Sequence, residues 1–341
     1  MRIQKRTVKK NSDCVHAGYS MKIQDRKVVV VGAGAVGTSY IYALLHTGLA
    51  DEIALIDIDR KKVEGEVLDL SHGLPFIPPV VVKQGDYSDC SEARLIVITA
   101  GAKQKSGQSR TDLVRENFQI IESICRQIAG SGTDAVVVMV TNPVDSLTQL
   151  AQSLLSLPRN QVIGSGTVLD TARLKYMLSR HCGLDARNIH AYVLGEHGDS
   201  EVVPWSLAHI AGVPIRQYCR ICQGCDSGKY LEEITEKVRD SAYHIIDYKG
   251  ATFYGIGLSL VRISGAVLRD EKSVLSVCVM LDGEYGIKDV CLSLPCVVGE
   301  TGVERIISAD LEKPERAALA DSAEKLASLY ASVPRQSMPA G

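Results

Sequence analysis

The sequence lacks any apolar run long enough to cross a membrane. Its longest runs of hydrophobic side chains, such as Val136–Val140, have the length of a strand, whereas a membrane span needs about 20 residues. The start of the chain also lacks the apolar core of a secretory signal peptide. We therefore expect a protein without a membrane-spanning segment that works in the cytoplasm.

A strong excess of charge of either sign is also missing. The formal net charge is −2 and the main body carries no basic stripe, so neither nucleic acid nor an anionic membrane is expected as a partner. We find no internal repeat and no low-complexity segment. With 341 residues, 45% of them hydrophobic, the chain has the size and composition of a globular protein with two domains.

Cysteine is present, but nothing in the sequence requires disulfides. A chain with this much apolar material can form a core without them, so the ten cysteines are predicted to be free thiols in a reducing compartment. Cys219, Cys222 and Cys225 are closely spaced and could bind a metal ion with His209 as a fourth ligand. A cysteine-rich surface loop is the simpler interpretation, and we predict no metal site.

A dinucleotide-binding pattern begins with the β-branched run Lys27–Val31, which predicts a buried strand. The motif Gly-Ala-Gly-Ala-Val-Gly follows at residues 32–37, then a helical stretch and a second strand that ends at Asp57. A glycine motif between a strand and a helix, with an acid about 20 residues further on, is typical of dinucleotide sites.

Each part of this pattern has a physical role. Gly32 permits the tight turn, Gly34 lets the backbone approach a pyrophosphate, and Gly37 lets the helix pack against the sheet. The N-terminus of the helix offers free N–H groups to the phosphates. Asp57 can accept hydrogen bonds from the ribose hydroxyls and would repel a 2′-phosphate, which favours NAD over NADP.

Strands and helices continue to alternate through the first half. The predicted fold is therefore a Rossmann-type, doubly wound parallel sheet over residues 27–165, after an N-terminal arm at 1–26. The second half predicts long helices over 231–247 and 314–331, with an antiparallel strand pair at 274–278 and 290–294. We assign residues 166–333 to an α+β domain and 334–341 to a C-terminal tail.

One histidine lies in a setting suited to proton transfer. His197 follows a predicted strand at 188–194, and the glycines on both sides of Glu-His in Gly-Glu-His-Gly-Asp-Ser (195–200) leave its ring uncrowded. Histidine changes charge near neutral pH. Asp170 and Arg173 share one face of a predicted helix. From the residues alone, His197 could equally cap a turn, and the other two could form an ordinary ion pair.

Five motifs in one order define a resemblance. They are the glycine motif at 32–37, a polar loop ending in Ser109-Arg110, Thr-Asn-Pro-Val-Asp at 141–145, Leu-Asp-Thr-Ala-Arg at 169–173 and the histidine motif at 195–200. In this combination the chain resembles the bacterial L-lactate dehydrogenases of the lactate/malate dehydrogenase superfamily, over about 27–333. The resemblance implies an NAD-dependent oxidoreductase that interconverts pyruvate and (S)-lactate, with the second domain binding substrate.

The resemblance also implies roles for individual residues. His197 would be the acid/base with Asp170 as its partner, Arg173 would bind the substrate carboxylate, and Arg110 would polarise the carbonyl. Further expected substrate contacts are Gln104, Asn142 and Thr252. The expected cofactor contacts are Gly32, Gly34, Val36, Gly37, Asp57, Thr99, Ala100, Gly101, Asn142, Val144 and Ile256.

Substrate choice is predicted from Gln104, where malate enzymes of the superfamily carry Arg. A neutral side chain there leaves the second carboxylate of oxaloacetate unpaired in a closed pocket, which typically costs several kcal/mol. A methyl group would be accepted, so pyruvate and lactate are favoured. Three alternatives remain open: a malate or other 2-hydroxy-acid dehydrogenase, a catalytically silent NAD-binding protein, and an NAD-dependent glycosidase on a related fold.

Expectations about regulation and assembly come from the resemblance alone. Some bacterial members are activated by fructose 1,6-bisphosphate, which binds through an Arg and a His. The matching positions here are Lys175 and His190, so the His is kept and the Arg is replaced by a residue that binds phosphate without a planar fork. Activation is therefore left open. A homotetramer is also implied.

Overall fold

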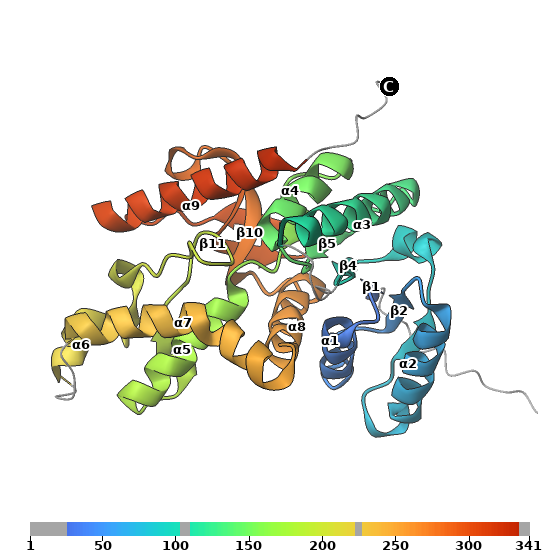
Figure 1. The fold of residues 1–341 in the computed structure, drawn as a ribbon. Coiled ribbons are helices and arrows are strands. Elements are labelled where there is room, and N and C mark those ends of the chain that lie inside the picture. Colours follow the sequence, from blue (N-terminus) through green and yellow to red (C-terminus); the bar gives the residue numbers. More distant parts are fainter. Residues whose placement is uncertain (1–25, 103–109, 222–226, 334–341) are drawn as a thin grey trace, which may run out of the picture.

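The computed structural model describes residues 26–102, 110–221 and 227–333. A nine-stranded sheet runs through it in the order β12-β11-β10-β6-β5-β4-β1-β2-β3 (Figure 1). The strands of this sheet are β1 (Lys27–Val31), β2 (Glu52–Ile56), β3 (Val81–Gln84), β4 (Leu95–Ile98), β5 (Val136–Met139), β6 (Val162–Gly164), β10 (Ser273–Asp282), β11 (Lys288–Gly299) and β12 (Gly302–Ile306).

The first half of the chain forms the parallel part of this sheet. Strands β1 to β6 pair in the order β3-β2-β1-β4-β5-β6, with every pairing parallel. The order reverses between β1 and β4, and the carboxyl ends of those two strands flank the point where such sheets bind ligands. The predicted doubly wound Rossmann fold is confirmed.

Helices cover both faces of the parallel strands, which explains why the strand sequences are apolar throughout instead of alternating. Val28 and Val30 pack into one apolar cluster, and Val29 and Val31 pack into the cluster on the opposite face. The helices of this half are α1 (Ala35–Leu45), α2 (Arg60–His72), α3 (Arg110–Gly130) and α4 (Val144–Leu154). The first cluster takes side chains from α1, and the second from α3 and α4.

The second half of the chain extends the same sheet with antiparallel strands. Strand β10 pairs with β6 at Cys278 and Gly164, and β11 and β12 follow in antiparallel order. The predicted antiparallel pair is therefore present and longer than expected. The helices of this half are α5 (Val168–Cys182), α6 (Ile215–Ile221), α7 (Ser227–Lys249), α8 (Tyr254–Leu268) and α9 (Lys313–Ser332).

Two packing arrangements tie the second half to the first. Helix α8 lies beside α1 (Figure 1), and the Tyr40 hydroxyl hydrogen-bonds the Ser264 hydroxyl between them at 2.6 Å in a buried position. Helices α5, α6 and α7 build a separate apolar cluster with a small sheet of β7 (Ile189–His190), β8 (His209–Ile210) and β9 (Val213–Pro214). Helix α5 leads from β6 into this cluster.

The predicted strand over 188–194 is wrong in its extent, because only β7 is a strand there. The backbone groups of Val193 and Leu194 form hydrogen bonds with partners that are not in an adjacent strand. The N–H of Val193 donates to the Thr171 hydroxyl, whose oxygen is 2.9 Å away, and the Val193 carbonyl accepts from the Thr167 hydroxyl. Leu194 then pairs with Val202 as an isolated bridge. Thr167 and Thr171 lie at the start of α5, and Val202 lies after the histidine motif. The alternation of residues within 188–194 cannot predict these partners.

No helix in the described ranges combines the length and the apolar character that crossing a bilayer requires.

Candidate active site

The turn after β1 has the close contacts that its glycines were predicted to allow. Gly32 has a φ of +120°, and a Cβ there would meet the Ala100 nitrogen at 2.5 Å. A Cβ on Gly37 would meet the Gly32 carbonyl oxygen at 2.1 Å. Gly34, at the N-cap of α1, has open space instead, so its backbone is accessible to a ligand. The turn therefore forms an accessible cradle at the N-terminus of a helix, which suits a pyrophosphate.

Asp57 lies at the end of β2 and holds this turn from the side. Its carboxylate accepts the N–H of Ala33 at 2.7 Å and the N–H of Asp59 at 3.0 Å. The acid that was predicted to face a ribose is thus placed beside the glycine turn. Asp57 also remains partly exposed, so it can accept further hydrogen bonds.

The predicted contacts at the end of β4 lie next to the same turn. The N–H of Ala100 donates to the Val31 carbonyl at 2.9 Å, and the Thr99 hydroxyl donates to the Gly32 carbonyl at 3.1 Å. A Cβ on Gly101 would meet the Thr141 methyl group at 2.5 Å, so this position also requires glycine. The ends of β1 and β4 therefore form one continuous edge.

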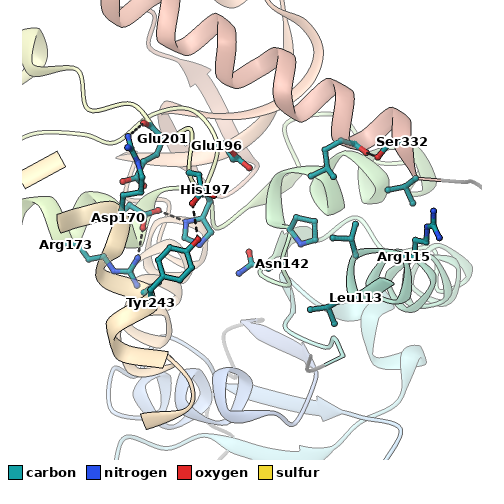
Figure 2. A pocket seen from close by; sticks show the side chains of 18 residues that line it. Leu113, Arg115, Asn142, Asp170, Arg173, Glu196, His197, Glu201, Tyr243 and Ser332 are labelled. Carbon is teal, nitrogen blue, oxygen red and sulfur yellow. Dashed lines mark hydrogen bonds and ion pairs between the residues drawn. The ribbon is translucent and has the colours of Figure 1, made fainter. Parts of the chain in front are cut away.

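His197 is held by a carboxylate from α5. Its Nδ1 lies 2.6 Å from Asp170 Oδ2, and Arg173 Nη1 donates to the other Asp170 oxygen at 2.7 Å. Figure 2 shows Asp170, Arg173 and Tyr243 on one side of the imidazole and Asn142 on the other. A spacing of three residues on a helix places Asp170 and Arg173 on the same face. The histidine loop, residues 195–200, brings His197 into contact with Asp170.

The charges of this cluster support one another. Burial alone would lower the pKa of His197, but the Asp170 carboxylate outweighs that effect and raises it to about 9. Burial would raise the pKa of Asp170, but His197 and Arg173 hold it below its ordinary value. At neutral pH the site therefore contains an imidazolium, a carboxylate and a guanidinium in contact.

These side chains line a cavity of about 470 Å³. Its wall includes Asn142, which follows β5, and parts of α3, α5, α7 and α9. Within it, a proton donor and a guanidinium lie beside the carboxyl ends of the parallel strands. That combination can bind an anionic group and protonate an oxygen next to it.

Three polar residues that line this cavity or contact its histidine were not predicted from the sequence: Asp145, Glu201 and Arg239. Asp145 accepts the backbone N–H of His197 at 2.8 Å and is 2% exposed. Glu201 is also buried, and burial together with nearby Asp170 raises its pKa to about 8. Glu201 Oε1 and Arg239 Nε have no hydrogen-bond partner among the described residues. Asp145 ends the motif at 141–145 and Glu201 directly follows the motif at 195–200, whereas no motif in the sequence indicates Arg239.

Several other predicted residues that the structure describes do not line this cavity. Val36 is on α1 and Val144 begins α4, both against the apolar clusters of the parallel half. Thr252 precedes α8 and Ile256 lies in its first turn, and neither lines the cavity. Arg110 is the first residue of α3, and its side chain is outside the described part. Gln104 lies outside the described residues altogether.

The positions considered for an activator and for a metal lie elsewhere in the second half. Lys175 is on α5 with its ammonium 5.8 Å from the centre of the Tyr192 ring, and burial lowers its pKa. His190 is exposed on β7. Cys219 is buried in α6, while Cys222 and Cys225 lie outside the described residues. In the part of the chain that the structure describes, no group of three His, Cys, Asp or Glu side chains is arranged to hold a metal ion.

Comparison with protein families gives two matches that together cover most of the chain. Residues 26–164 match the NAD binding domain of lactate/malate dehydrogenase. Residues 167–333 match the α/β C-terminal domain of lactate/malate dehydrogenase.

Individual relatives are similar over nearly their whole length. An L-lactate dehydrogenase of Treponema denticola is 54% identical over 310 residues, which are 90% of this chain and 98% of the relative. An L-lactate dehydrogenase of Acetivibrio thermocellus is 49% identical over 290 residues, 85% of this chain and 92% of the relative. The crystal structure of the minor L-lactate dehydrogenase from Enterococcus mundtii in a ligand-bound form is 42% identical and superposes with a TM-score of 0.88, covering 91% of this chain and 99% of the other.

Proposed function

Because the chain belongs to the lactate/malate dehydrogenase family, we propose that it is an NAD-dependent L-lactate dehydrogenase that interconverts pyruvate and (S)-lactate. The observation that carries this proposal is the contact of His197 with Asp170, and of Asp170 with Arg173, inside one cavity. The relatives from Treponema denticola and Acetivibrio thermocellus, at 54% and 49% identity, are L-lactate dehydrogenases. A protein that only bound NAD would have no use for a partly buried proton donor beside a carboxylate-binding group.

The turn after β1 fits NAD. Gly34 leaves its backbone open, the N-terminus of α1 favours phosphate, and Asp57 places a carboxylate where ribose hydroxyls would lie. When bound, NADH supplies the hydride that adds to the carbonyl carbon of pyruvate. We assign the cofactor contacts to the residues predicted from the sequence, with residues 27–165 as the NAD-binding domain and 166–333 as the substrate domain.

Arg173 would bind the pyruvate carboxylate. Its Nη1 is engaged by Asp170, so the remaining N–H groups of its planar fork are available for two parallel hydrogen bonds. Arg110, Asn142 and Thr252 are proposed as further contacts of the substrate, with Arg110 opposing negative charge on the carbonyl oxygen as it develops.

His197 would donate the proton. Its Nδ1 is engaged by Asp170, so Nε2 carries the proton that passes to the carbonyl oxygen as the C–H bond forms. The products are (S)-lactate and NAD, and the imidazole is left neutral. In the reverse direction the same nitrogen accepts the hydroxyl proton of lactate.

Several finer assignments belong to the same proposal. Gln104 would favour a methyl group over a second carboxylate, and Lys175 with His190 would form the site for fructose 1,6-bisphosphate. Homotetramer formation is proposed from the family and from a groove lined by exposed apolar residues of α1 and α8, where Tyr42 and Leu258 are both more than half exposed. The cytoplasm is the proposed location.

The deciding experiment measures NADH oxidation with pyruvate and with oxaloacetate, each with and without millimolar fructose 1,6-bisphosphate. We expect kcat/KM to favour pyruvate, and Gln104→Arg to shift the preference toward oxaloacetate by at least about 100-fold, since it supplies a partner for the second carboxylate. Gln108→Arg is the matched control in the same predicted loop and should leave the pyruvate/oxaloacetate ratio of kcat/KM unchanged. NADH binding without turnover of either oxo acid would refute the proposed reaction.

A further inference from the structure

Asp145 makes a contact with the histidine loop that the proposed reaction does not yet use. Its Oδ2 accepts the backbone N–H of His197 at 2.8 Å, across 52 residues of sequence. The carboxyl is 2% exposed and lies in the first turn of α4. His197 is therefore held at two points, with its ring bonded to α5 through Asp170 and its backbone bonded to α4 through Asp145.

Other hydrogen bonds hold the start of the histidine loop, but they do not involve the backbone N–H of His197. Gly195 forms a two-way backbone bridge with Ser293 of β11, and the N–H of Glu196 donates to the Ser322 hydroxyl of α9 at 2.9 Å. These bonds fix where the loop enters. The Asp145 bond fixes the backbone of His197 itself, and with it the direction in which the ring leaves the chain.

A buried negative charge on Asp145 destabilises the fold unless a favourable interaction offsets its loss of hydration. Burial raises the pKa of Asp145 to about 6, so the carboxylate is less stable here than in water. An asparagine could accept the same N–H without that cost. What the charge adds is attraction for the protonated imidazole of His197, whose pKa it helps to raise. The N-terminus of α4 also favours an anion.

Asp145 also lies close in sequence to a residue proposed to contact both substrate and cofactor. Asn142 precedes α4 by two residues, lines the cavity, and is fixed through its carbonyl, which accepts from Asn117 Nδ2 at 2.9 Å. A short segment of the first half of the chain therefore sets the positions of Asn142 and, through Asp145, of His197. His197, the proposed proton donor, belongs to the second half of the chain. Its backbone is therefore bonded directly to the first half, which is proposed to bind NADH.

We propose that Asp145 is a positioning residue of hydride and proton transfer, which fixes the His197 backbone against α4 and adds a second negative charge behind the imidazolium. This inference rests on the proposed function. The titratable groups that face the Asp145 carboxyl are His197 and Glu196 from the loop and the Cys278 thiol from β10, with Cys291 of β11 hydrogen-bonded to that thiol.

The test compares Asp145→Asn, which keeps an acceptor but removes the charge, with Asp145→Ala, which removes both. Ser146→Ala is the matched control. The Ser146 side chain is next to Asp145 in sequence and is buried to the same degree, and its hydroxyl has no hydrogen-bond partner among the described residues. We expect kcat for pyruvate reduction to fall less than about 10-fold in Asp145→Asn and about 100-fold in Asp145→Ala. In Asp145→Asn the alkaline limit of kcat/KM should also move down by about half a pH unit or more.

A second readout does not depend on turnover. In protein labelled with ¹⁵N-histidine, the ring signal of His197, assigned through His197→Asn, should titrate at lower pH in Asp145→Asn than in the wild type. Unchanged titration and equal kcat losses in both variants would overturn the proposal and leave Asp145 a purely structural residue. If the wild type turned over no 2-oxo acid, the proposed function would fail, whereas the titration would still report on the contact.

A variant outside α4 keeps the proposal testable if Asp145→Asn does not fold. Cys278→Ser replaces the thiol that faces Asp145 with a stronger donor, which stabilises the carboxylate form. The acid limit of pyruvate reduction, where Asp145 becomes protonated, should then move to lower pH. An acid limit that stays in place would contradict a role for the Asp145 charge.

Discussion

His197 keeps its proton at neutral pH because neighbouring charges outweigh the cost of its burial. Burial lowers the pKa of an imidazole, but Asp170, 2.6 Å from Nδ1, raises it to about 9. An unfolded chain would release this proton near pH 6.5. The bound proton therefore stabilises the fold fully below about pH 6.5, and that contribution is lost as the pH rises through about 9.

The same charge balance predicts the effect of Asp170→Asn. Without the Asp170 carboxylate, burial and Arg173 both disfavour the imidazolium and Asp145 favours it only in part, so the pKa of His197 should fall well below about 9. The alkaline limit of kcat/KM for pyruvate should move down from near pH 9, and activity at pH 7.5 should fall on the order of 100-fold. A pH profile of pyruvate reduction measures both.

The control for that experiment is Asp185→Asn. Asp185 is an exposed acid that pairs with Arg187 at the surface, so its loss should leave the profile unchanged. An Asp170→Asn enzyme with the wild-type alkaline limit would show that some other group sets the protonation of His197.

At the scale of elements, the sequence predicted what is locally encoded. The unit β1–α1–β2 was found because its strand, glycine turn, helix and acid follow one another in the chain. The predicted extent of the strand before the histidine motif was wrong, because residues 193–195 bond to Thr171, Val202 and Ser293, which belong to no strand of the small sheet.

For the site, as for the fold, the sequence indicated the residues that belong to local motifs but not the contacts between distant segments. His197, Asp170 and Arg173 belong to recognisable motifs, and the structure brings them together as expected. The contact of Asp145 with the His197 backbone and the burial of Glu201 depend on how α4 and α7 pack, which no spacing in the sequence records.

The glycine turn gives a prediction at this scale. In Gly37→Ala the new Cβ would lie 2.1 Å from the Gly32 carbonyl oxygen, so backbone must move, and we expect a loss of stability of about 1–3 kcal/mol. Gly34→Ala has open space and an extended backbone, so its melting temperature should stay near that of the wild type. Thermal melts of the two ligand-free variants measure the difference.

NADH binding separates the two glycines further. If the phosphates approach the Gly34 backbone, a methyl group there should raise the Kd for NADH by about 10-fold or more without destabilising the free protein. A Gly34→Ala protein that binds NADH as tightly as the wild type would place the phosphates elsewhere. Gly65→Ala, in the exposed middle of α2, is the control for a harmless added methyl group.

At the scale of the whole molecule, exposed apolar side chains collect where the first and second halves meet. Tyr42 of α1 and Tyr254 and Leu258 of α8 are each more than 60% exposed and line one groove, together with residues of α2. A groove of this kind is a candidate for contact between copies of the chain. It lies on the α1–α8 pair that joins the two halves.

A charge in this groove should weaken assembly. We expect the wild type to have about four times the chain mass of 36.9 kDa, as the proposed homotetramer requires, and Leu258→Glu to have a lower mass because the carboxylate would be buried without a partner. Light scattering after size-exclusion chromatography measures the mass. Val81→Glu, at an exposed position on the edge strand β3, is the control and should not change it. A Leu258→Glu protein with the wild-type mass would exclude this groove as the interface.

The pairing of β6 with β10 makes the two halves parts of one sheet. A hinge movement that opened one half away from the other would have to break the pairing of Cys278 with Gly164 and separate α1 from α8. We therefore expect access to the cavity to depend on surface side chains and loops, and not on a movement between the halves. For the same reason, a chain cut at residue 165 would leave β6 as an unpaired edge strand, so we expect either half produced alone to aggregate more readily than the whole chain.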